Sequence, residues 1–343
     1  MKDRFVATAL AVLLSVSLFF SGLFSWFTPV PLFYISRRYS LRWGGITLLL
    51  IALLLSGAYF GVFHYLSVSK DPNSLSWFSW LPGMAYYEPF GKKAVMGSVF
   101  ASLTFFGSMG LILAWRGPKE RRLASLAAWT WLGATFAAAL VVVLFSKGHL
   151  VSLTENVTKY LGLALDQFIS LNQAAGLKGE EIAFIEKNRQ WIIGSFLRIL
   201  PGVSLAAGLF LTWLNLVVCK RIFGAVGFWG EVQDFSLFRI PFSLVWTVIA
   251  ALSLFLANAY LWQWEILSFA LLNLFILVFV IYFFQGLAIL SFYLVLKGIS
   301  PWLRFLCYAL LAIFLQPLGL LLAGLGFFDS WFNFRRLNVR SSS

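Results

Sequence analysis

Eight long apolar runs, nearly free of ionisable residues, dominate the pattern of hydrophobic and polar positions along the chain. A helix needs about 20 apolar residues to cross the hydrocarbon core of a bilayer, and each run is long enough. None alternates polar and apolar residues as outer-membrane barrel strands do, so helices are the consistent choice. The pattern predicts an all-α, polytopic transmembrane helix bundle of about eight spans, at residues 5–27, 44–66, 94–115, 123–145, 196–219, 241–262, 266–290 and 302–325.

The pattern changes at two places. Pro29 and Pro31 stop a regular helix after the first run, so residues 30–36 are expected to form a short re-entrant or interfacial piece. Residues 147–190 are the longest polar stretch, and their apolar positions recur at helical spacing on both sides of a glycine-containing break. This stretch predicts a polar amphipathic helical hairpin that caps a cavity, docks a partner or lies flat on the bilayer. We expect a single transmembrane domain over residues 1–336, followed by a disordered tail at 337–343.

Composition and charge agree with a membrane protein. The chain is 61% hydrophobic and only 11% charged, against roughly 25% charged residues in a soluble domain. Its formal net charge of +13 comes from Lys and Arg in short connections between apolar runs, which is typical of orientation in a bilayer rather than of nucleic-acid binding. We expect the bacterial cytoplasmic (inner) membrane, with the lipid bilayer as the main partner and no nucleic acid.

Orientation is not settled by these charges. The connections at 29–43, 116–122 and 220–239 are rich in Lys and Arg and predict a cytoplasmic location, which places the 147–190 hairpin outside. With eight spans, however, the basic tail containing Arg335 and Arg336 then falls on the opposite side, and so does the N-terminus. The sequence leaves this conflict open.

Catalytic and metal-binding patterns are absent from the sequence. His64 and His149 belong to no metal-ligand motif, and Cys219 and Cys307 stand far apart. There is no Ser/His/Asp nucleophile pattern, no glycine-rich phosphate loop and no pair of carboxylates within an apolar run. We therefore expect a non-catalytic protein with no cofactor and no metal site; the less favoured alternative is an intramembrane enzyme.

Polar side chains inside the apolar runs are the candidate ligand-binding residues. An unpaired amide in hydrocarbon is costly, so each must face another helix or a wet cavity. Asn258, Trp262 and Glu265 are spaced to share one face of the sixth span, and Tyr282 and Gln285 share a face of the seventh. The hypothesis is a small-molecule pocket formed by Asn258, Glu265, Asn273, Tyr282 and Gln285. The alternative is hydrogen bonding between helices, worth about 1 kcal/mol for each residue.

The end of the chain carries a compact polar and aromatic motif. Asp329 is expected to pair with Arg335 or Arg336 just past the last span, while Trp331 lies at headgroup depth. Two interpretations stay open for Asp329, Trp331, Arg335 and Arg336: they fix the end of the span, or they dock a partner protein.

The C-terminal half resembles a known family. The segments that carry the resemblance are 212–216 (TWLNL), 238–241 (FRIP), 273–274 (NL), 282–288 (YFFQGLA) and 324–336 (GLGFFDSWFNFRR). From about residue 195 to 336 the chain is similar to the YybS-like family of bacterial predicted membrane proteins, domain of unknown function 2232. That family is distantly similar to the substrate-binding S components of energy-coupling-factor transporters.

The resemblance to S components implies an all-helical bundle that holds a small molecule. It also implies that an AxxxA pattern on the first helix, here Ala7 and Ala11, contacts a transporter coupling subunit. The leading hypothesis is therefore a non-catalytic, small-molecule-binding or transport-associated membrane subunit. The alternative is a structural or assembly protein of the bacterial cell envelope that acts through protein–protein contacts.

Overall fold

The computed structural model describes residues 2–69, 75–82, 84, 87–117, 119, 122–145, 150–174, 179–224, 227 and 234–336, and the expected tail at 337–343 lies outside them. The described residues form helices joined by short connections and contain no strand, which confirms the all-α prediction. They group into two compact units. Unit 1 comprises residues 1–119, 127–197 and 211–230, and unit 2 comprises residues 120–126, 198–210 and 231–343. The expectation of one domain over 1–336 remains a prediction.

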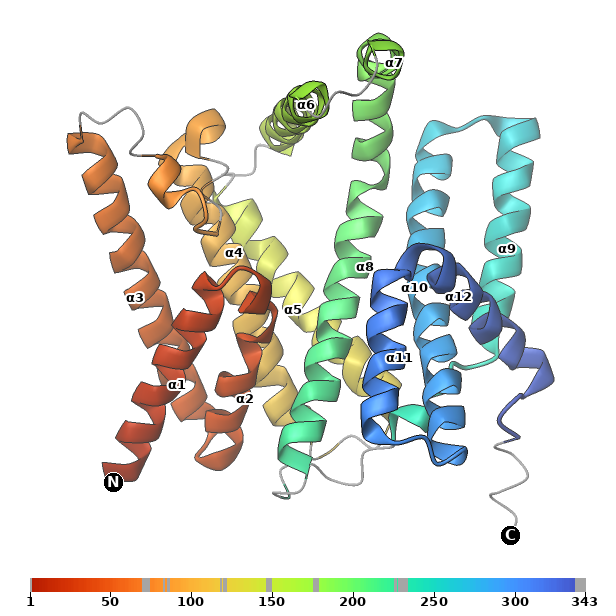
Figure 1. Cartoon of the computed structure of the whole chain (residues 1–343), viewed down its shortest axis with the longest axis horizontal. Helices are drawn as coiled ribbons and strands as arrows, with labels where there is room; N and C mark the ends of the chain where they lie inside the picture. The colour runs from red at the N-terminus through yellow and green to blue at the C-terminus, as the bar shows by residue number, and fades with distance from the viewer. Residues whose placement is uncertain are drawn as a thin grey trace. The chain divides into compact units, whose positions relative to one another are not determined.

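Unit 1 contains most of the first eight α-helices, together with two 3-10 helices (Figure 1). They are α1 (Lys2–Phe20), the 3-10 helix η1 (Leu23–Phe27), α2 (Pro29–Arg38), α3 (Leu41–Val68), η2 (Ser76–Phe78), α4 (Tyr87–Arg116), α5 (Leu123–Phe145), α6 (Leu150–Ala174), α7 (Gly179–Lys187) and α8 (Arg189–Phe223). Val12 and Phe19 of α1 pack with Ile51 and Tyr59 of α3 and with Val99 of α4 in a buried hydrophobic core. Packing of these apolar faces fixes α1 beside α3.

The helices α1 and α2 form an antiparallel pair that returns the chain to its starting side. The Tyr39 hydroxyl, just past α2, donates to the Asp3 carbonyl at the start of α1 (3.4 Å). The rings of Phe5 and Trp43 lie 5.4 Å apart, so α3 also starts at this level. At the other end of α1, Phe20 lies 6.1 Å from the ring of Tyr59. The N-terminus and the 39–42 connection are therefore on the same side.

The first predicted span, 5–27, ends too late. In the structure α1 stops at Phe20, Gly22 takes a φ of 69° that favours glycine, and η1 follows. Pro29 then begins α2, because a proline is well tolerated in the first turn, where its missing N–H is not needed. The short piece expected at 30–36 lies within α2, whose residues Leu32, Phe33 and Ile35 are buried.

Unit 2 contains η5 (Phe235–Leu237), α9 (Ser243–Ala257), the π-helical turn η6 (Asn258–Trp262), α10 (Glu265–Leu296), α11 (Pro301–Ile313) and α12 (Leu315–Phe332). Its tightest packing is the crossing of α10 and α12, which meet through glycines. A Cβ on Gly286 would lie 2.0 Å from the Leu322 carbonyl oxygen, and one on Gly326 would lie 2.1 Å from the Tyr282 carbonyl oxygen. Only glycine lets the two backbones approach so closely.

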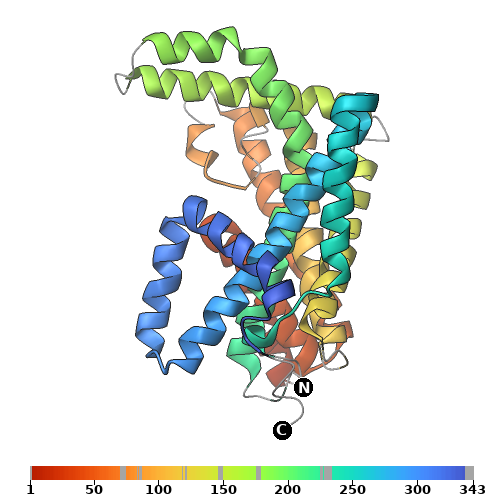
Figure 2. The ribbon, with the colours of Figure 1, turned by 90° about the vertical axis from the view of Figure 1, so that its right-hand side faces the viewer.

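The eighth predicted span, 302–325, is not a continuous helix. The helices α11 and α12 meet at Phe314 with a bend of 109°. Pro317 explains why the helix breaks at this point. Proline lacks an N–H, and its ring clashes with the carbonyl four residues earlier, which belongs to Ile313, the last residue of α11. Figure 2 shows α11 leading away from the end of α10 and α12 leading back. The Tyr293 hydroxyl near the end of α10 donates to the Phe334 carbonyl (2.9 Å), so both ends of the pair lie on one side.

Seven helices of the described chain are long and apolar enough to cross a membrane: α1, α3, α4, α5, α8, α9 with η6, and α10. The fourth predicted span coincides with α5, while α3, α4, α8 and α10 extend beyond the predicted runs. Because α1 is followed by a return through η1 and α2, and α11 by a return through α12, six net crossings remain.

Candidate functional site: a buried polar cluster and an arginine-lined pocket

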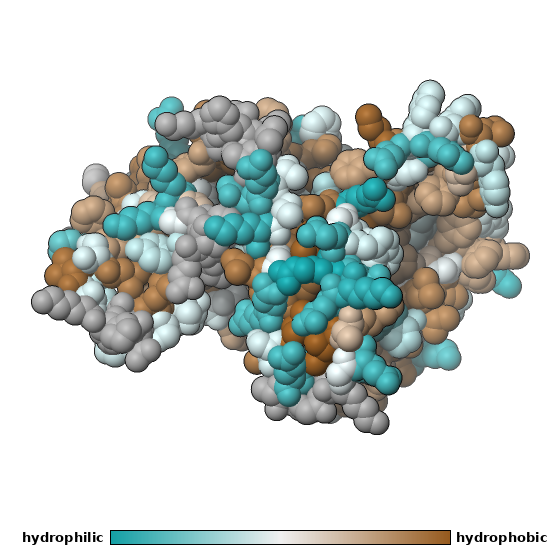
Figure 3. Space-filling model, turned by 90° about the horizontal axis from the view of Figure 1, so that it is seen from above, coloured by the Kyte–Doolittle hydropathy of each residue, from teal (hydrophilic) through white to brown (hydrophobic). Residues whose placement is uncertain are grey.

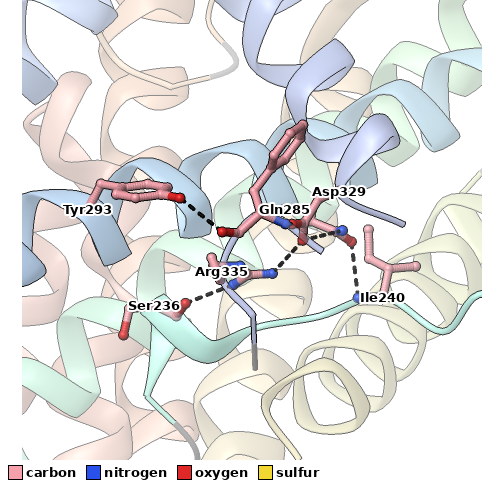
Figure 4. Close-up of polar contacts among 7 residues, drawn as sticks. Ser236, Ile240, Gln285, Tyr293, Asp329 and Arg335 are labelled. Atoms are coloured by element: carbon pink, nitrogen blue, oxygen red, sulfur yellow. Dashed lines mark hydrogen bonds and ion pairs between the residues drawn. The ribbon is translucent and has the colours of Figure 1, made fainter. Parts of the chain in front are cut away.

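A buried polar cluster joins α10, α12 and the segment before α9 within unit 2 (Figure 4). Gln285 Nε2 donates to Asp329 Oδ2 (3.1 Å), and Gln285 Oε1 accepts from the Ile240 backbone N–H (3.1 Å). The other oxygen of Asp329 accepts from the Phe334 backbone N–H (2.9 Å). These residues come from three separate stretches of sequence, so the cluster holds the end of α12 in place.

Arg335 supplies the charge that balances Asp329. Its Nη2 donates to Asp329 Oδ2 (2.9 Å), and its Nη1 donates to the Ser236 carbonyl (2.7 Å). The two residues are only 3% and 1% exposed. A buried carboxylate is tolerated when it is paired and hydrogen-bonded, and Asp329 accepts three hydrogen bonds. Of the two predicted partners, Arg335 is the one that pairs with Asp329.

Asn258 stabilises the turn between α9 and α10. Its Oδ1 accepts from the Trp264 backbone N–H (2.9 Å), and its Nδ2 donates to the Trp264 carbonyl and to the Ser268 hydroxyl (3.0 and 2.7 Å). The chain reverses at Gln263, which has a φ of 53°. Glu265 consequently opens α10 and does not share a helix face with Asn258, contrary to the predicted spacing.

Asn273 inserts into the backbone of α8 at a proline. Pro201 lies inside α8, and Asn273 Oδ1 accepts from the Gly202 backbone N–H while its Nδ2 donates to the Arg198 carbonyl (2.8 Å). In an unbroken α-helix the Gly202 N–H would donate to that same carbonyl. A Cβ on Gly202 would lie 2.6 Å from Asn273 Oδ1, so the glycine admits the amide.

The remaining two predicted ligand residues lie elsewhere. The Glu265 side chain is 89% exposed and lies 3.7 Å from Arg198. Tyr282 is buried against Phe327, with ring centroids 5.1 Å apart. The structure therefore does not bring the five predicted residues to one cavity. Asn258, Asn273 and Gln285 each bond to protein groups, which is the hydrogen-bonding alternative, and a role of any of the five in ligand binding remains untested.

The predicted docking residues are also divided. Ala11 is buried and Ala7 is partly buried, so this face of α1 turns toward helices of its own unit. Asp329 and Arg335 form a buried ion pair with each other, so their side chains are not exposed to a partner. Trp331 is 46% exposed and packs edge-on against Phe327, with centroids 4.8 Å apart. Of the closing motif, Trp331 and the exposed Arg336 remain accessible.

A pocket of about 500 Å³ lies next to this cluster, entirely within unit 2. It is formed by residues that precede or begin α5 and α9, together with one residue of α12: Arg122, Ala124, Ser125, Phe238, Arg239, Ile240, Pro241, Phe242 and Ser330. The sequence did not reveal this pocket, because its walls come from three segments more than 80 residues apart in the chain. The available signal was an arginine just before each of two apolar runs.

The lining of the pocket contains basic and hydroxyl side chains. Arg122 and Arg239 contribute two guanidinium groups, and the N-termini of α5 and α9 add the positive ends of two helix dipoles. Ser125 and Ser330 offer hydroxyl groups, and the lining contains no carboxylate. Within the described residues no group of three or more His, Cys, Asp or Glu side chains could hold a metal ion. The pocket suits an anionic group held by charge and hydrogen bonds.

A family model described as "Predicted membrane protein (DUF2232)" matches residues 92–330. The chain belongs to the DUF2232 family of predicted membrane proteins. The DUF2232 match runs from α4 through Ser330 and includes Gln285, Asp329 and every residue that lines the pocket. Comparisons with curated proteins and with solved structures found no match.

Proposed function

We propose that this membrane protein is a non-catalytic, transport-associated component that binds a small anionic group in the arginine-lined pocket. The pocket itself is the observation that carries the proposal. Its volume of about 500 Å³ falls within the range of small-molecule sites, and it combines apolar walls with two arginines and two hydroxyl groups. Its lining offers no histidine, cysteine or carboxylate, so its groups suit binding better than acid–base chemistry.

The charges of the connections support a cytoplasmic location for the pocket. With six net crossings, one side holds 17 of the 26 Lys and Arg residues and 5 of the 13 Asp and Glu residues, a net charge of +12, in the stretches 1–4, 37–42, 116–122, 220–239, 297–304 and 329–340. The other side, at 70–93, 147–198 and 265, has a net charge of +1. Connections rich in Lys and Arg stay in the cytoplasm. We infer that both termini and the pocket face the cytoplasm of a bacterial cell.

The inferred topology would place the basic tail and the N-terminus together with the other basic connections. Counting α11 and α12 as one crossing places the basic tail on the side opposite to the other basic connections. Counting α1 without its return through α2 does the same to the N-terminus. The two short returns come from proline-interrupted apolar segments, one near each end of the chain. Paired segments of this kind mark binding sites in many transporters, which supports a transport-associated role over simple anchoring.

Native mass spectrometry of the full-length protein tests the proposal. The protein is released from bilayers of phosphatidylcholine alone, with phosphatidylglycerol added, or with soluble inorganic phosphate or citrate added. We expect one additional bound anion per protein, and the two kinds of addition separate a lipid headgroup from a free anion as its source. Arg122→Gln with Arg239→Gln is expected to weaken the affinity for the anion about 100-fold, since each lost charge-assisted contact costs roughly 1.5 kcal/mol.

The matched control is Arg336→Gln, which removes an exposed arginine of the same side that does not line the pocket. Its occupancy is expected to equal that of the wild type. Equal retention by all three proteins, or no bound anion under any condition, contradicts the proposal. Copurification of cell-envelope proteins without any anion favours the alternative function in assembly.

A further inference from the structure

We propose that the hairpin of α6 and α7, with the first turns of α8, holds one hydrocarbon chain of a zwitterionic or uncharged lipid. The site is a groove of about 440 Å³ in unit 1. One wall is formed by Leu161, Ala164, Leu165 and Phe168, which recur three and four residues apart on one face of α6. Every side chain that lines the groove is apolar. The proposal concerns the less basic side of the molecule and is independent of the pocket in unit 2.

The groove is continuous with the membrane-spanning surface. Its opposite wall includes Ile192, Ile193 and Phe196, which belong to the first two turns of α8, a helix long and apolar enough to span. Trp191 at the same level is 71% exposed, and tryptophan prefers the boundary between headgroups and hydrocarbon. The groove therefore meets the bilayer where acyl chains begin.

The hairpin has the arrangement of an interfacial element. Figures 1 and 2 show α6 and α7 running across the direction of α3 and α4 of the same unit, as helices do that lie in the plane of a membrane. Seen from above, the hairpin in the lower centre of Figure 3 displays hydrophilic residues around an apolar strip. Phe168 and Phe196, which line the groove, are each more than half exposed, so a lipid chain in the groove would cover exposed apolar surface.

The groove is preformed, because a single arginine fastens its two walls. Arg189, at the start of α8, donates both to the Asp166 carboxylate and to the Gly162 carbonyl of α6, the latter at 3.2 Å. A site held open in this way loses little conformational freedom when a chain enters it.

Charge selects the class of lipid. In the sequence, residues 147–189 carry five carboxylates and five cationic side chains, so this stretch offers an anionic headgroup no net attraction. A protein segment could occupy the same apolar groove. A bound protein segment is therefore one outcome of the test below.

The test uses full-length protein in nanodiscs containing phosphatidylcholine with a photoreactive diazirine on one acyl chain. Peptide mapping is expected to show adducts concentrated on residues 161–168 and 185–196, above the level on other lipid-facing helices. Ala164→Phe fills the groove and should lower these adducts about tenfold, which corresponds to about 1.4 kcal/mol. Leu171→Phe adds an aromatic ring to the same helix outside the groove and should leave them unchanged.

When diazirine-labelled phosphatidylglycerol replaces the labelled phosphatidylcholine, labelling of the groove should be no stronger than with phosphatidylcholine. If Ala164→Phe fails to fold, Ile185→Asn takes its place with the same expected loss, because it introduces a polar group into the apolar lining. Two labelling results would overturn the proposal: adducts spread evenly over the spans, or equal labelling of the wild type and the filled groove. A protein segment or a second copy of the chain bound in the groove would also overturn it.

Discussion

Replacing Arg335 by methionine is the sharpest perturbation of the buried cluster. Methionine keeps much of the length of the side chain but removes the hydrogen bonds to Asp329 and to the Ser236 carbonyl. Asp329, which is 1% exposed in the wild type, would then keep two neutral donors and have no cation beside it. Leaving a buried charge without its partner costs roughly 3–5 kcal/mol. We expect Arg335→Met to lower the free energy of unfolding by about this amount.

The assay is equilibrium unfolding of the full-length protein in mixed micelles, followed by tryptophan fluorescence. The double variant Arg335→Met with Asp329→Asn removes both charges and keeps an amide that can accept the Phe334 N–H. It should recover most of the loss, to within about 1.5 kcal/mol of the wild type. Arg336→Met, at the exposed neighbouring position, should change stability by less than about 0.5 kcal/mol. A single variant as stable as the wild type, or a double variant less stable than the single one, refutes the reasoning.

Three further predictions follow from other contacts. Gly326→Ala places a methyl group 2.1 Å from a backbone oxygen of α10 and should cost at least about 2 kcal/mol in the same assay, whereas Gly324→Ala, with open space around it, should be neutral. Asn273→Ala should cost about 1–3 kcal/mol, because it leaves a donor and an acceptor of α8 unpaired in the membrane; an unchanged unfolding midpoint would count against this role. The hydrogen bond from Arg189 lowers the pKa of Asp166 below its usual 3.8, so its stabilisation of the hairpin is fully present above that value and is lost as pH falls through the lowered pKa. Hydrogen exchange of α6, corrected for intrinsic rate, should show this acid weakening in the wild type, and Arg189→Gln should abolish it.

Much of the fold could be predicted from the sequence, because crossing a bilayer imposes length and apolarity on a helix. The run at 123–145 coincides with α5 for this reason. Local rules also held within single helices: Tyr282 and Gln285 share a buried face of α10. The errors arose where a backbone reversal interrupts an apolar run. Gln263 turns the chain between Asn258 and Glu265, and Pro317 ends α11 at Ile313 although the surrounding residues remain apolar.

The candidate site was harder to predict, because it depends on contacts between distant segments. Asp329 and Arg335 are close in sequence, and their pairing was foreseen, but their burial depends on Gln285 and on the carbonyl of Ser236. The pocket forms only because the fold brings Arg122 and Arg239 to the same pocket lining. No local sequence pattern around either residue indicates this. The buried amides attracted attention as ligand residues, yet hydrogen bonds to backbone groups satisfy them.

The position of bound phosphate is the most direct test of the central claim, that the arginine-lined pocket holds an anionic group. An experimental structure of the full-length protein in nanodiscs with phosphatidylglycerol or with added inorganic phosphate would supply it. The account predicts phosphate oxygens within hydrogen-bonding distance of the guanidinium groups of Arg122 and Arg239. A pocket closed by its own side chains, with phosphate density only elsewhere on the protein, would contradict the account.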